Sequence, residues 1–449
     1  MQMRKKIGYA TGDLGISISY FAVGFFFMFY LTDIVGMAPL LAGTVILIGK
    51  IWDGINDPLM GILSDRTKSR FGRKRVYILF GSIPFAISFV LLWIIPAAIN
   101  EWVQFALATT SLLIYATAYS VVAVPYMAMV PVMTGDYNER TQITGLRAIL
   151  STMGTILGGG VALLVSSASD ETVGLRTMAI GFAAFTFVSL LIAACSVKGV
   201  EQIRGSDTQI VDISLARYIA LPKERNVLIL LIFKFLGAIA TGCLMASIPY
   251  FAVHILGSPG TSTYGVAIYA GMSALLIPVW NKLTHLLDKR RLLLIANSLG
   301  AILLLAIGLL MKEGFSLPFF AGCAMLGIFM SAYLFIPYSL VPDLVDYYHH
   351  KTGERHESVF FGLWMTVHQL GIAVAGFILG AFLSVYGYEG NASAQSDSAL
   401  LGVRLAFGLI PGFFLVLAAL VLQKYGITRT VYQRIKAELA EKNNSGTLK

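Results

Sequence analysis

The feature that most constrains this chain is a succession of long apolar segments. A helix that spans a bilayer needs about 20 mostly apolar residues. Twelve segments reach that length: residues 7–32, 39–63, 76–98, 103–131, 142–167, 174–195, 226–252, 262–284, 290–311, 317–342, 358–386 and 400–423. Charged residues make up only 13% of the chain, whereas soluble domains carry about 25%. The sequence therefore predicts an all-α membrane protein with twelve transmembrane helices and a surface that faces lipid.

The positions of the basic residues indicate how these segments cross the membrane. If the N-terminus is cytoplasmic, so are the even-numbered connections, and these hold the basic clusters at 66–75 and 289–291. The outer connections hold mainly acids, among them Asp33, Glu101 and Asp170. Because cytoplasmic loops are rich in lysine and arginine, we expect a multi-pass plasma (inner) membrane protein with both termini in the cytoplasm. The net charge of +9 then reflects topology, and no nucleic-acid partner is expected, since that would need a contiguous basic face.

The chain divides into two halves of six segments each. Its longest polar interruption predicts a six-helix bundle at 1–196, a cytoplasmic linker at 197–225, a second six-helix bundle at 226–424 and a cytoplasmic tail at 425–449. Short motifs recur in the same order: Pro125-Tyr126 matches Pro337-Tyr338, and Gly145-Leu146-Arg147 matches Gly362-Leu363-Trp364. This duplication predicts two pseudo-symmetric bundles with a substrate site between them, near the membrane midplane, that opens alternately to each side.

The second segment carries the sharpest group of ionisable residues. Asp53 and Asp57 are four residues apart and share one helix face, with Asn56 beside them. Ionisable groups inside a membrane are costly and mark functional sites, and hard cations take oxygen ligands. We interpret the group as a site for Na⁺ or H⁺. The alternative is an internal salt bridge in which Lys50 or Arg147 neutralises the acids.

Two connections carry candidate gating residues. Residues 61–75 read Gly-Ile-Leu-Ser-Asp-Arg-Thr-Lys-Ser-Arg-Phe-Gly-Arg-Lys-Arg, which resembles the signature loop between the second and third spans of the major facilitator superfamily. These charges hold the loop inside the cell, and they also suit a latch at the cytoplasmic gate that includes Asp65, Arg66 and Arg73. The connection between the tenth and eleventh segments predicts a second gate network, made of Asp343, Asp346 and Glu357.

Several motifs in order resemble the glycoside–pentoside–hexuronide:cation symporter family of melibiose permease. They are Tyr-Leu-Thr-Asp at 30–33, Trp-Asp-Gly-Ile-Asn-Asp-Pro at 52–58, Phe-Gly-Arg-Lys-Arg at 71–75, Val-Pro-Tyr at 124–126, Asp-Tyr-Asn-Glu-Arg-Thr at 136–141 and Asp-Leu-Val-Asp-Tyr at 343–347. The resemblance runs from end to end and implies the major facilitator fold. It also implies coupling to Na⁺, Li⁺ or H⁺ at Asp53, Asn56, Asp57 and Ser120, where Ser120 stands for a fourth-span threonine of the family.

The sugar site implied by the same resemblance is only partly matched. Ser17 stands where the family example has a sugar-binding aspartate, and Gln369 stands in place of a lysine, whereas Arg147 matches a fifth-span arginine. Melibiose-type recognition is therefore not expected. The residues predicted to line a different substrate pocket are Ser17, Tyr126, Arg147, Lys234, Trp364, His368 and Gln369.

The leading hypothesis is a cation-coupled symporter of a sugar, glycoside or sugar acid that works by alternating access. A lysolipid or another organic anion is the alternative substrate, because the vertebrate lysophosphatidylcholine symporter looks like a distant relative of this family. An integral-membrane enzyme is the remote alternative, since no nucleophile–base set or metal-ligand spacing stands out. We expect no organic cofactor and no obligatory oligomer, so the protein is predicted to act as a monomer in the bilayer.

Overall fold

The computed structural model describes residues 2–134, 136–168, 170–200, 224–352, 357–390, 392 and 394–444. Every regular element in these ranges is a helix. The first half of the chain forms α1 (Met3–Phe29), η1 (Tyr30–Ile34), α2 (Pro39–Arg66), α3 (Arg75–Leu91), α4 (Glu101–Met127), α5 (Val130–Met133), α6 (Tyr137–Gly158), α7 (Val161–Ser166) and α8 (Glu171–Ser196). The second half forms α10 (Arg225–His254), α11 (Gly260–Leu286), α12 (Lys289–Leu310), α13 (Ser316–Thr352), α14 (Glu357–Val385), α15 (Asp397–Leu422) and α16 (Arg429–Asn444).

The twelve predicted spans are all present as helices. Ten helical stretches in the described ranges are long and apolar enough to cross a membrane by length and composition. The other two spans are α3, which is shorter, and α2, which carries Lys50 and the acid pair. The prediction of an all-α protein with twelve membrane helices is therefore confirmed.

Several predicted spans differ from the helices in the structure. The third, expected to reach residue 98, ends at Leu91, and the fourth, expected at 103–131, is divided into α4 and α5. The fifth, expected at 142–167, is divided into α6 and α7, and the division falls at Gly158-Gly159-Gly160. Consecutive glycines weaken a helix, and here they also let α6 approach α1, because a Cβ on Gly158 would lie 2.7 Å from the carbonyl oxygen of Ile18. The tenth span, expected to end at residue 342, continues as α13 to Thr352 despite Pro337 and Pro342.

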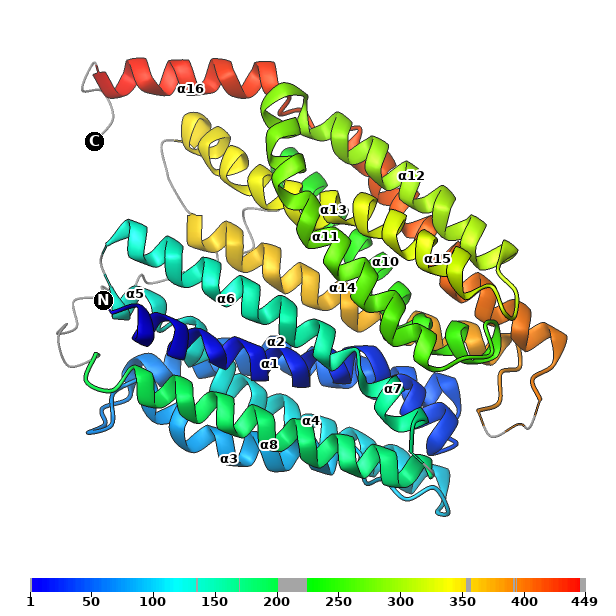
Figure 1. The fold of residues 1–449 in the computed structure, drawn as a ribbon. Coiled ribbons are helices and arrows are strands. Elements are labelled where there is room, and N and C mark those ends of the chain that lie inside the picture. Colours follow the sequence, from blue (N-terminus) through cyan, green and yellow to red (C-terminus); the bar gives the residue numbers. More distant parts are fainter. Residues whose placement is uncertain are drawn as a thin grey trace.

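The helices pack with the same neighbours in both halves. In the first half, α1 packs against α6 and α8, and α3 packs against α4 and α8. In the second half, α10 packs against α14 and α15, and α12 packs against α13 and α15. Figure 1 shows the two sets as separate bundles, coloured blue to green and green to orange. This agreement confirms the predicted pair of pseudo-symmetric bundles. The exact boundary between them stays a prediction, because residues 201–223 lie outside the described ranges.

The surfaces along which the bundles meet form a seam, and its two sides differ. On one side α2 packs along α14, and on the other α6 and α7 meet α11 more loosely. Glycines allow the closer approach: a Cβ on Gly380 of α14 would lie 2.2 Å from the carbonyl oxygen of Pro39, and one on Gly43 of α2 would lie 2.6 Å from that of Gly376. Small residues of this kind let membrane helices come into backbone contact.

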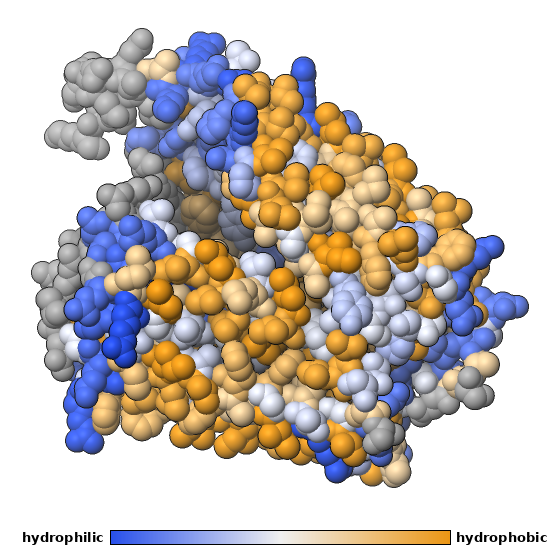
Figure 2. Space-filling model, in the orientation of Figure 1, coloured by the Kyte–Doolittle hydropathy of each residue, from blue (hydrophilic) through white to orange (hydrophobic). Residues whose placement is uncertain are grey.

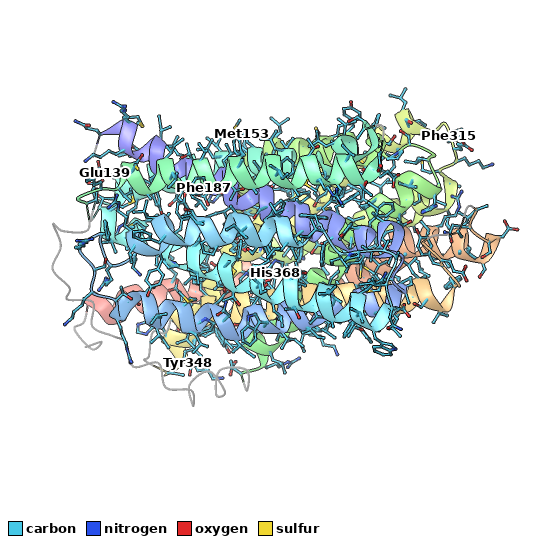
Figure 3. All side chains as sticks on the ribbon, turned by 90° about the horizontal axis from the view of Figure 1, so that it is seen from below. Glu139, Met153, Phe187, Phe315, Tyr348 and His368 are labelled. Carbon is cyan, nitrogen blue, oxygen red and sulfur yellow. The ribbon has the colours of Figure 1, made fainter. Side chains whose placement is uncertain are left out.

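The two ends of the molecule are also different. We call the end that carries both chain termini the terminal end, and the opposite one the distal end (Figure 1). Glu139 and Tyr348 lie toward the terminal end, Phe315 lies at the distal end, and His368 lies near the middle of the long dimension (Figure 3). Figure 2 shows the surface hollowed between the bundles toward the terminal end. The bundles therefore converge at the distal end and diverge at the terminal end.

Candidate functional site

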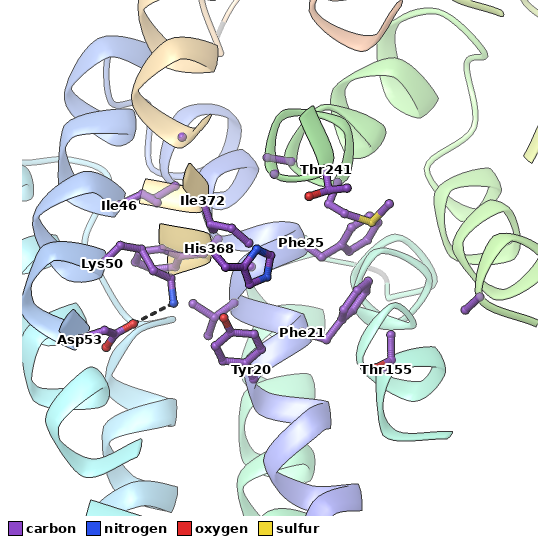
Figure 4. Close-up of a pocket in the computed structure, with 18 of the residues that line it drawn as sticks. Tyr20, Phe21, Phe25, Ile46, Lys50, Asp53, Thr155, Thr241, His368 and Ile372 are labelled. Carbon is purple, nitrogen blue, oxygen red and sulfur yellow. Dashed lines mark hydrogen bonds and ion pairs between the residues drawn. The ribbon is translucent and has the colours of Figure 1, made fainter. Parts of the chain in front are cut away.

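A cavity of about 500 Å³ lies between the two bundles. Figure 4 shows Tyr20 and Phe21 of α1 and Lys50 of α2 facing Thr241 of α10 and His368 of α14 across it. Both bundles contribute to the wall, which is largely aromatic and aliphatic and carries a few polar groups. Ligand sites commonly combine an apolar lining with a few placed polar groups. The cavity therefore has the position and the character of a substrate site.

Asp53, on α2, places the predicted cation site at the wall of this cavity. Its side chain is only 9% exposed, and its Oδ2 atom lies 2.8 Å from Lys50 Nζ. Its Oδ1 atom is buried and has no hydrogen-bond partner in the described part of the chain. A buried carboxylate oxygen without a partner is costly, so this oxygen is available to a cation or a proton.

The other three predicted cation ligands lie beside Asp53. Ser120 of α4 donates a hydrogen bond from its hydroxyl to Asp57 Oδ1 at 2.5 Å. Asn56 is buried, and its Nδ2 atom has no described partner. Because Asp53 and Asp57 are one helical turn apart, their side chains are neighbours on α2. Carboxylate, amide and hydroxyl oxygens are thus gathered on α2 and α4, and this is the donor set that hard cations prefer.

The contacts of Lys50 test the alternative interpretation of this group, an internal salt bridge that neutralises the acids. It neutralises Asp53, and its ammonium also lies 4.7 Å from the centre of the Tyr20 ring. Arg147 does not take part, because its guanidinium pairs with Asp13 at 2.6 Å. One internal salt bridge is therefore present, yet Asp57 lies outside it, with Ser120 as its hydrogen-bond donor.

The residues predicted to bind substrate are distributed over three places. His368 lines the cavity. Ser17, Tyr126 and Arg147 lie within the first bundle: Ser17 hydrogen-bonds Ser151 at 2.7 Å, and the Tyr126 hydroxyl lies 2.8 Å from Asp13 Oδ2. In the second bundle, Lys234 lies against the ring of Trp364, and Gln369 follows His368 on α14 with its Oε1 atom buried and unpaired.

The cavity also has lining residues that the sequence did not single out. The hydroxyl-bearing members are Tyr20, Tyr115, Tyr119, Thr152, Thr155, Thr241, Tyr269, Ser273 and Ser331. Tyrosine and threonine are common in membrane helices, so their identity carries no signal. Their positions do carry a signal, because Tyr20 and Thr241 occupy comparable positions in the first helix of each bundle.

The described contacts of the predicted gating residues stay within one bundle or join it to α16. Asp65 pairs with Lys74 at 2.7 Å, and Arg66 and Arg73 lie on the same connection. Asp343 pairs with Lys289 at 2.6 Å, and Asp346 accepts a hydrogen bond from the Tyr432 hydroxyl at 3.0 Å. The side chain of Glu357 lies outside the described residues. The gating role of these residues stays a prediction.

A polar cluster at the distal end joins the two bundles, and sequence reasoning missed it. Asp33 Oδ1 accepts a hydrogen bond from the Tyr388 hydroxyl at 2.5 Å and lies 3.2 Å from His254 Nε2. The hydroxyls of Thr32 and Tyr250 lie 2.8 Å apart. We call these five residues the distal latch. Thr32 and Asp33 belong to the first bundle and the other three belong to the second, so the latch closes the cavity at this end.

The comparisons with known proteins agree with this geometry. A family model described as MFS/sugar transport protein matches residues 8–429. The inner membrane symporter YicJ of Escherichia coli is 29% identical, over 98% of this chain and 95% of its own. The putative glycoside/cation symporter YagG of the same species is 25% identical, over 98% and 95%. The sodium-dependent lysophosphatidylcholine symporter 1 of Gallus gallus is 25% identical, over 98% and 90%.

Solved structures establish the fold independently of these sequences. The inward-open structure of the xylose transporter XylE from E. coli superposes with a TM-score of 0.68 at 12% sequence identity, over 96% of this chain and 98% of that one. Together with two pseudo-symmetric bundles, a central cavity and the buried Asp53 at its wall, the match over residues 8–429 leads to one conclusion: the chain belongs to the MFS/sugar transport protein family and is a cation-coupled secondary transporter, not an enzyme.

Proposed function

We propose that this protein imports a sugar, glycoside or sugar acid together with Na⁺ or H⁺. The substrate occupies the central cavity, and the cation is held by Asp53, Asn56, Asp57 and Ser120. The single observation that carries the proposal is the position of Asp53, which lies on the cavity wall with one carboxylate oxygen buried and unpartnered. A cation bound there also lowers the electrostatic cost of the neighbouring Asp57 carboxylate, so cation binding and cavity shape are linked.

The distribution of charges supports one orientation of the molecule in the membrane. The basic connections at 66–75 and 289–291 lie at the terminal end, and lysine and arginine favour the cytoplasmic side. The cavity then opens to the cytoplasm, and the distal latch closes it toward the outside. Import requires the opposite state as well, in which the latch separates and the terminal ends of the bundles come together.

Thermal unfolding of the purified full-length protein tests the coupling. The ligand panel holds glucosides, xylosides and glucuronides, each with and without Na⁺ and across a range of pH. A ligand that binds the folded state raises its stability, so we expect a shift that needs Na⁺, or a pH at which the acids are protonated, together with one sugar class. Counterflow of the same labelled sugar in proteoliposomes then measures transport.

Asp57→Asn is the decisive variant for the cation site, since Asp57 is not paired with Lys50. We expect it to abolish the Na⁺-dependent shift while the folded protein survives. Asp53→Asn is a weaker test, because it leaves Lys50 without its partner and removal of one member of a buried ion pair costs about 3–5 kcal/mol. Asp397→Asn is the matched control, at an exposed acid at the start of α15 that does not line the cavity. A Na⁺-dependent shift that persists in Asp57→Asn would sink the assigned cation site.

An amphiphile is the second candidate substrate, and the cavity wall favours it. The lining includes Phe21, Phe25, Phe27, Met245 and Ile277, which would suit an acyl chain better than a hydroxylated ring. A panel of lysolipids with increasing chain length separates the two readings. Stabilisation that grows with chain length, with no response to any sugar, would replace the sugar by a lysolipid.

A further inference from the structure

The two bundles place different charges at related positions, below the cavity toward the terminal end. In the first bundle, Asp13 of α1 pairs with Arg147 of α6 at 2.6 Å, and Tyr126 of α4 hydrogen-bonds the same carboxylate. The recurring motifs relate Tyr126 to Tyr338 and Arg147 to Trp364. The corresponding group in the second bundle is therefore Lys234 of α10 with Tyr338 and Trp364. The Asp13–Arg147 pair in the first bundle carries no net charge, whereas the Lys234 group in the second bundle carries one positive charge.

Lys234 is enclosed by aromatic rings. Its side chain is only 2% exposed, and its ammonium lies 5.0 Å from the centre of the Tyr333 ring, 5.5 Å from that of Tyr338 and 5.0 Å from that of Trp364. No carboxylate forms a salt bridge with it in the described part of the chain. Ring faces attract a desolvated cation, but they do not neutralise it, so the second bundle holds a buried positive charge without a counter-ion.

This cation lies next to the cavity along three helices. Lys234 is seven residues, or about two turns, from Thr241 on α10. Tyr338 is one turn from Leu334 on α13, and Trp364 is one turn from His368 on α14; Thr241, Leu334 and His368 all line the cavity. In each helix the Lys234 group lies on the terminal side. It therefore lies beside the cavity in the second bundle, on the terminal side of the lining residues.

Two further polar atoms near the Lys234 group lack partners in the described structure. His368 Nδ1 and Gln369 Oε1 are buried without a hydrogen bond in the described structure. His368 lies one turn above Trp364 on the same face of α14. Buried polar groups are normally hydrogen-bonded, so an unpaired ring nitrogen one turn from Trp364, whose ring contacts the Lys234 ammonium, indicates a place for a ligand.

We propose that Lys234, with His368 above it, forms an anion-binding subsite that takes the acidic group of a sugar acid in the central cavity. This inference rests on the proposed function, since it names the substrate class of that same cavity. The sugar ring lies among the aromatic and hydroxyl side chains, and its carboxylate reaches down to the ammonium. The substrate supplies the negative charge that the second bundle lacks, so a sugar acid binds in preference to its neutral analogue.

A matched pair of ligands tests the subsite. p-Nitrophenyl β-glucuronide and p-nitrophenyl β-glucoside differ only at C6, which is a carboxylate in the first and a hydroxymethyl group in the second. Dissociation constants are obtained from the dose dependence of thermal unfolding of the full-length protein in nanodiscs with Na⁺. The variants are Lys234→Met, which keeps the apolar stem, Lys234→Arg, which keeps the charge, and the exposed control Lys282→Met.

We expect wild type and Lys282→Met to bind the glucuronide more tightly than the glucoside. Lys234→Met should weaken glucuronide binding about tenfold or more, as expected for loss of a bond between charged groups, and leave glucoside binding within about threefold. Lys234→Arg should retain the preference. This selective loss is the readout that a purely structural role of Lys234 would not produce.

Several outcomes would overturn the inference. An unchanged preference in Lys234→Met, or equal losses for both ligands, removes the subsite. Glucoside binding by the wild type without glucuronide binding removes it too, but leaves the proposed function intact. If the wild type binds neither sugar with Na⁺, the proposed function fails and this inference fails with it. If lysophosphatidate binds in a way that depends on Lys234 and the glucuronide does not bind, the subsite takes a lipid headgroup. The proposal that it takes a sugar acid is then overturned.

Discussion

The distal and terminal ends of the seam hold the bundles in different ways. At the distal end the described contacts cross from one bundle to the other, through the distal latch and through the hydrogen bond from the Thr263 hydroxyl to the Gly159 carbonyl oxygen. At the terminal end the described ion pairs of Asp65 and Asp343 join residues of the same bundle. Ion pairs thus stabilise each bundle separately at the terminal end, whereas hydrogen bonds connect the two bundles at the distal end. We call these distal contacts between the bundles the joint.

This difference indicates which contacts set the conformation. Contacts inside one bundle are the same whichever way the transporter faces, so they stabilise the fold without favouring either state. Contacts across the seam at one end are lost when the bundles rock apart at that end, and a ligand or mutation shifts an equilibrium only through such differences. The distal contacts should therefore determine how long the cavity stays open to the terminal end.

The largest expected effect comes from Gly380→Ala in α14. Its Cβ would lie 2.2 Å from the Pro39 carbonyl oxygen, and backbone cannot yield cheaply, so the closed distal seam should lose about 1–3 kcal/mol. Thr241→Cys, in a background that carries Cys195→Ser, Cys243→Ala and Cys323→Ala, reports opening through its reaction with an impermeant thiol reagent added on the distal side. The reaction should become much faster. Gly181→Ala, where a Cβ meets nothing within 4 Å, is the control, and equal rates in both variants would contradict the joint.

The second largest effect is expected for Asp33→Asn. The substitution replaces a charged acceptor of the Tyr388 hydrogen bond by a neutral one and weakens the contact with His254. Hydrogen bonds to charged groups contribute about 1.5–3 kcal/mol and those to neutral groups about 0.5–1.5 kcal/mol, so the expected loss is about 1–1.5 kcal/mol. The same cysteine assay should show more distal opening, and uptake should slow if distal closure limits the cycle. Asp170→Asn is the control, because Asp170 lies at the distal end but caps α8 within the first bundle. Slower labelling in Asp33→Asn would contradict the latch.

A smaller effect is expected for Thr263→Val on the looser side of the seam. It removes the hydrogen bond to the Gly159 carbonyl oxygen, which is 2.9 Å long, and such bonds contribute about 0.5–1.5 kcal/mol. Thr152→Val, whose hydroxyl bonds within α6, is the matched change without a partner across the seam. If Thr263→Val opened the distal end more than Asp33→Asn did, the main joint would lie between α6 and α11 rather than at the latch.

The smallest effect is expected for Glu438→Gln on α16, at the terminal end. The Arg434 guanidinium, and then the His350 ring, hold the pKa of this carboxyl below its usual range. A lowered pKa adds stability that is complete above the unfolded pKa of about 4.3 and is lost as pH falls through the folded value. The variant should remove only this acid sensitivity from thermal unfolding and leave thiol labelling at Thr241 unchanged. Altered labelling would place α16 in the opening transition.

The sequence predicted the elements better than their contacts. Twelve spans follow from apolar length, and the duplication follows from the paired Pro-Tyr and Gly-Leu motifs. The acid pair at Asp53 and Asp57 could be located because a charge inside a membrane segment stands out against its neighbours. Its surroundings follow from helical spacing on a single helix, so Lys50 was correctly named as a possible partner of Asp53.

Contacts between distant segments could not be predicted in the same way. Asp33 meets Tyr388, 355 positions away, and in the sequence it looks like an ordinary acid in an outer loop. Arg147 was predicted to bind the substrate or to neutralise the acid pair, whereas in the structure it pairs with Asp13. Hydropathy indicates that a residue lies in a span, but the direction that its side chain faces depends on how the helices rotate when they pack.

The short π-helical turn η1, which ends the first span, shows how such a direction can be set. A π turn contains one residue more than an α turn, so the insertion of one residue fixes where Thr32 and Asp33 face. Deleting Leu31 would return the segment to α-helical register and rotate the residues after it by about 100°, away from Tyr250 and Tyr388. The contact between the two bundles at the distal latch thus depends partly on the number of residues in η1. Deletion of one residue would break the contact although all five latch residues would still be present.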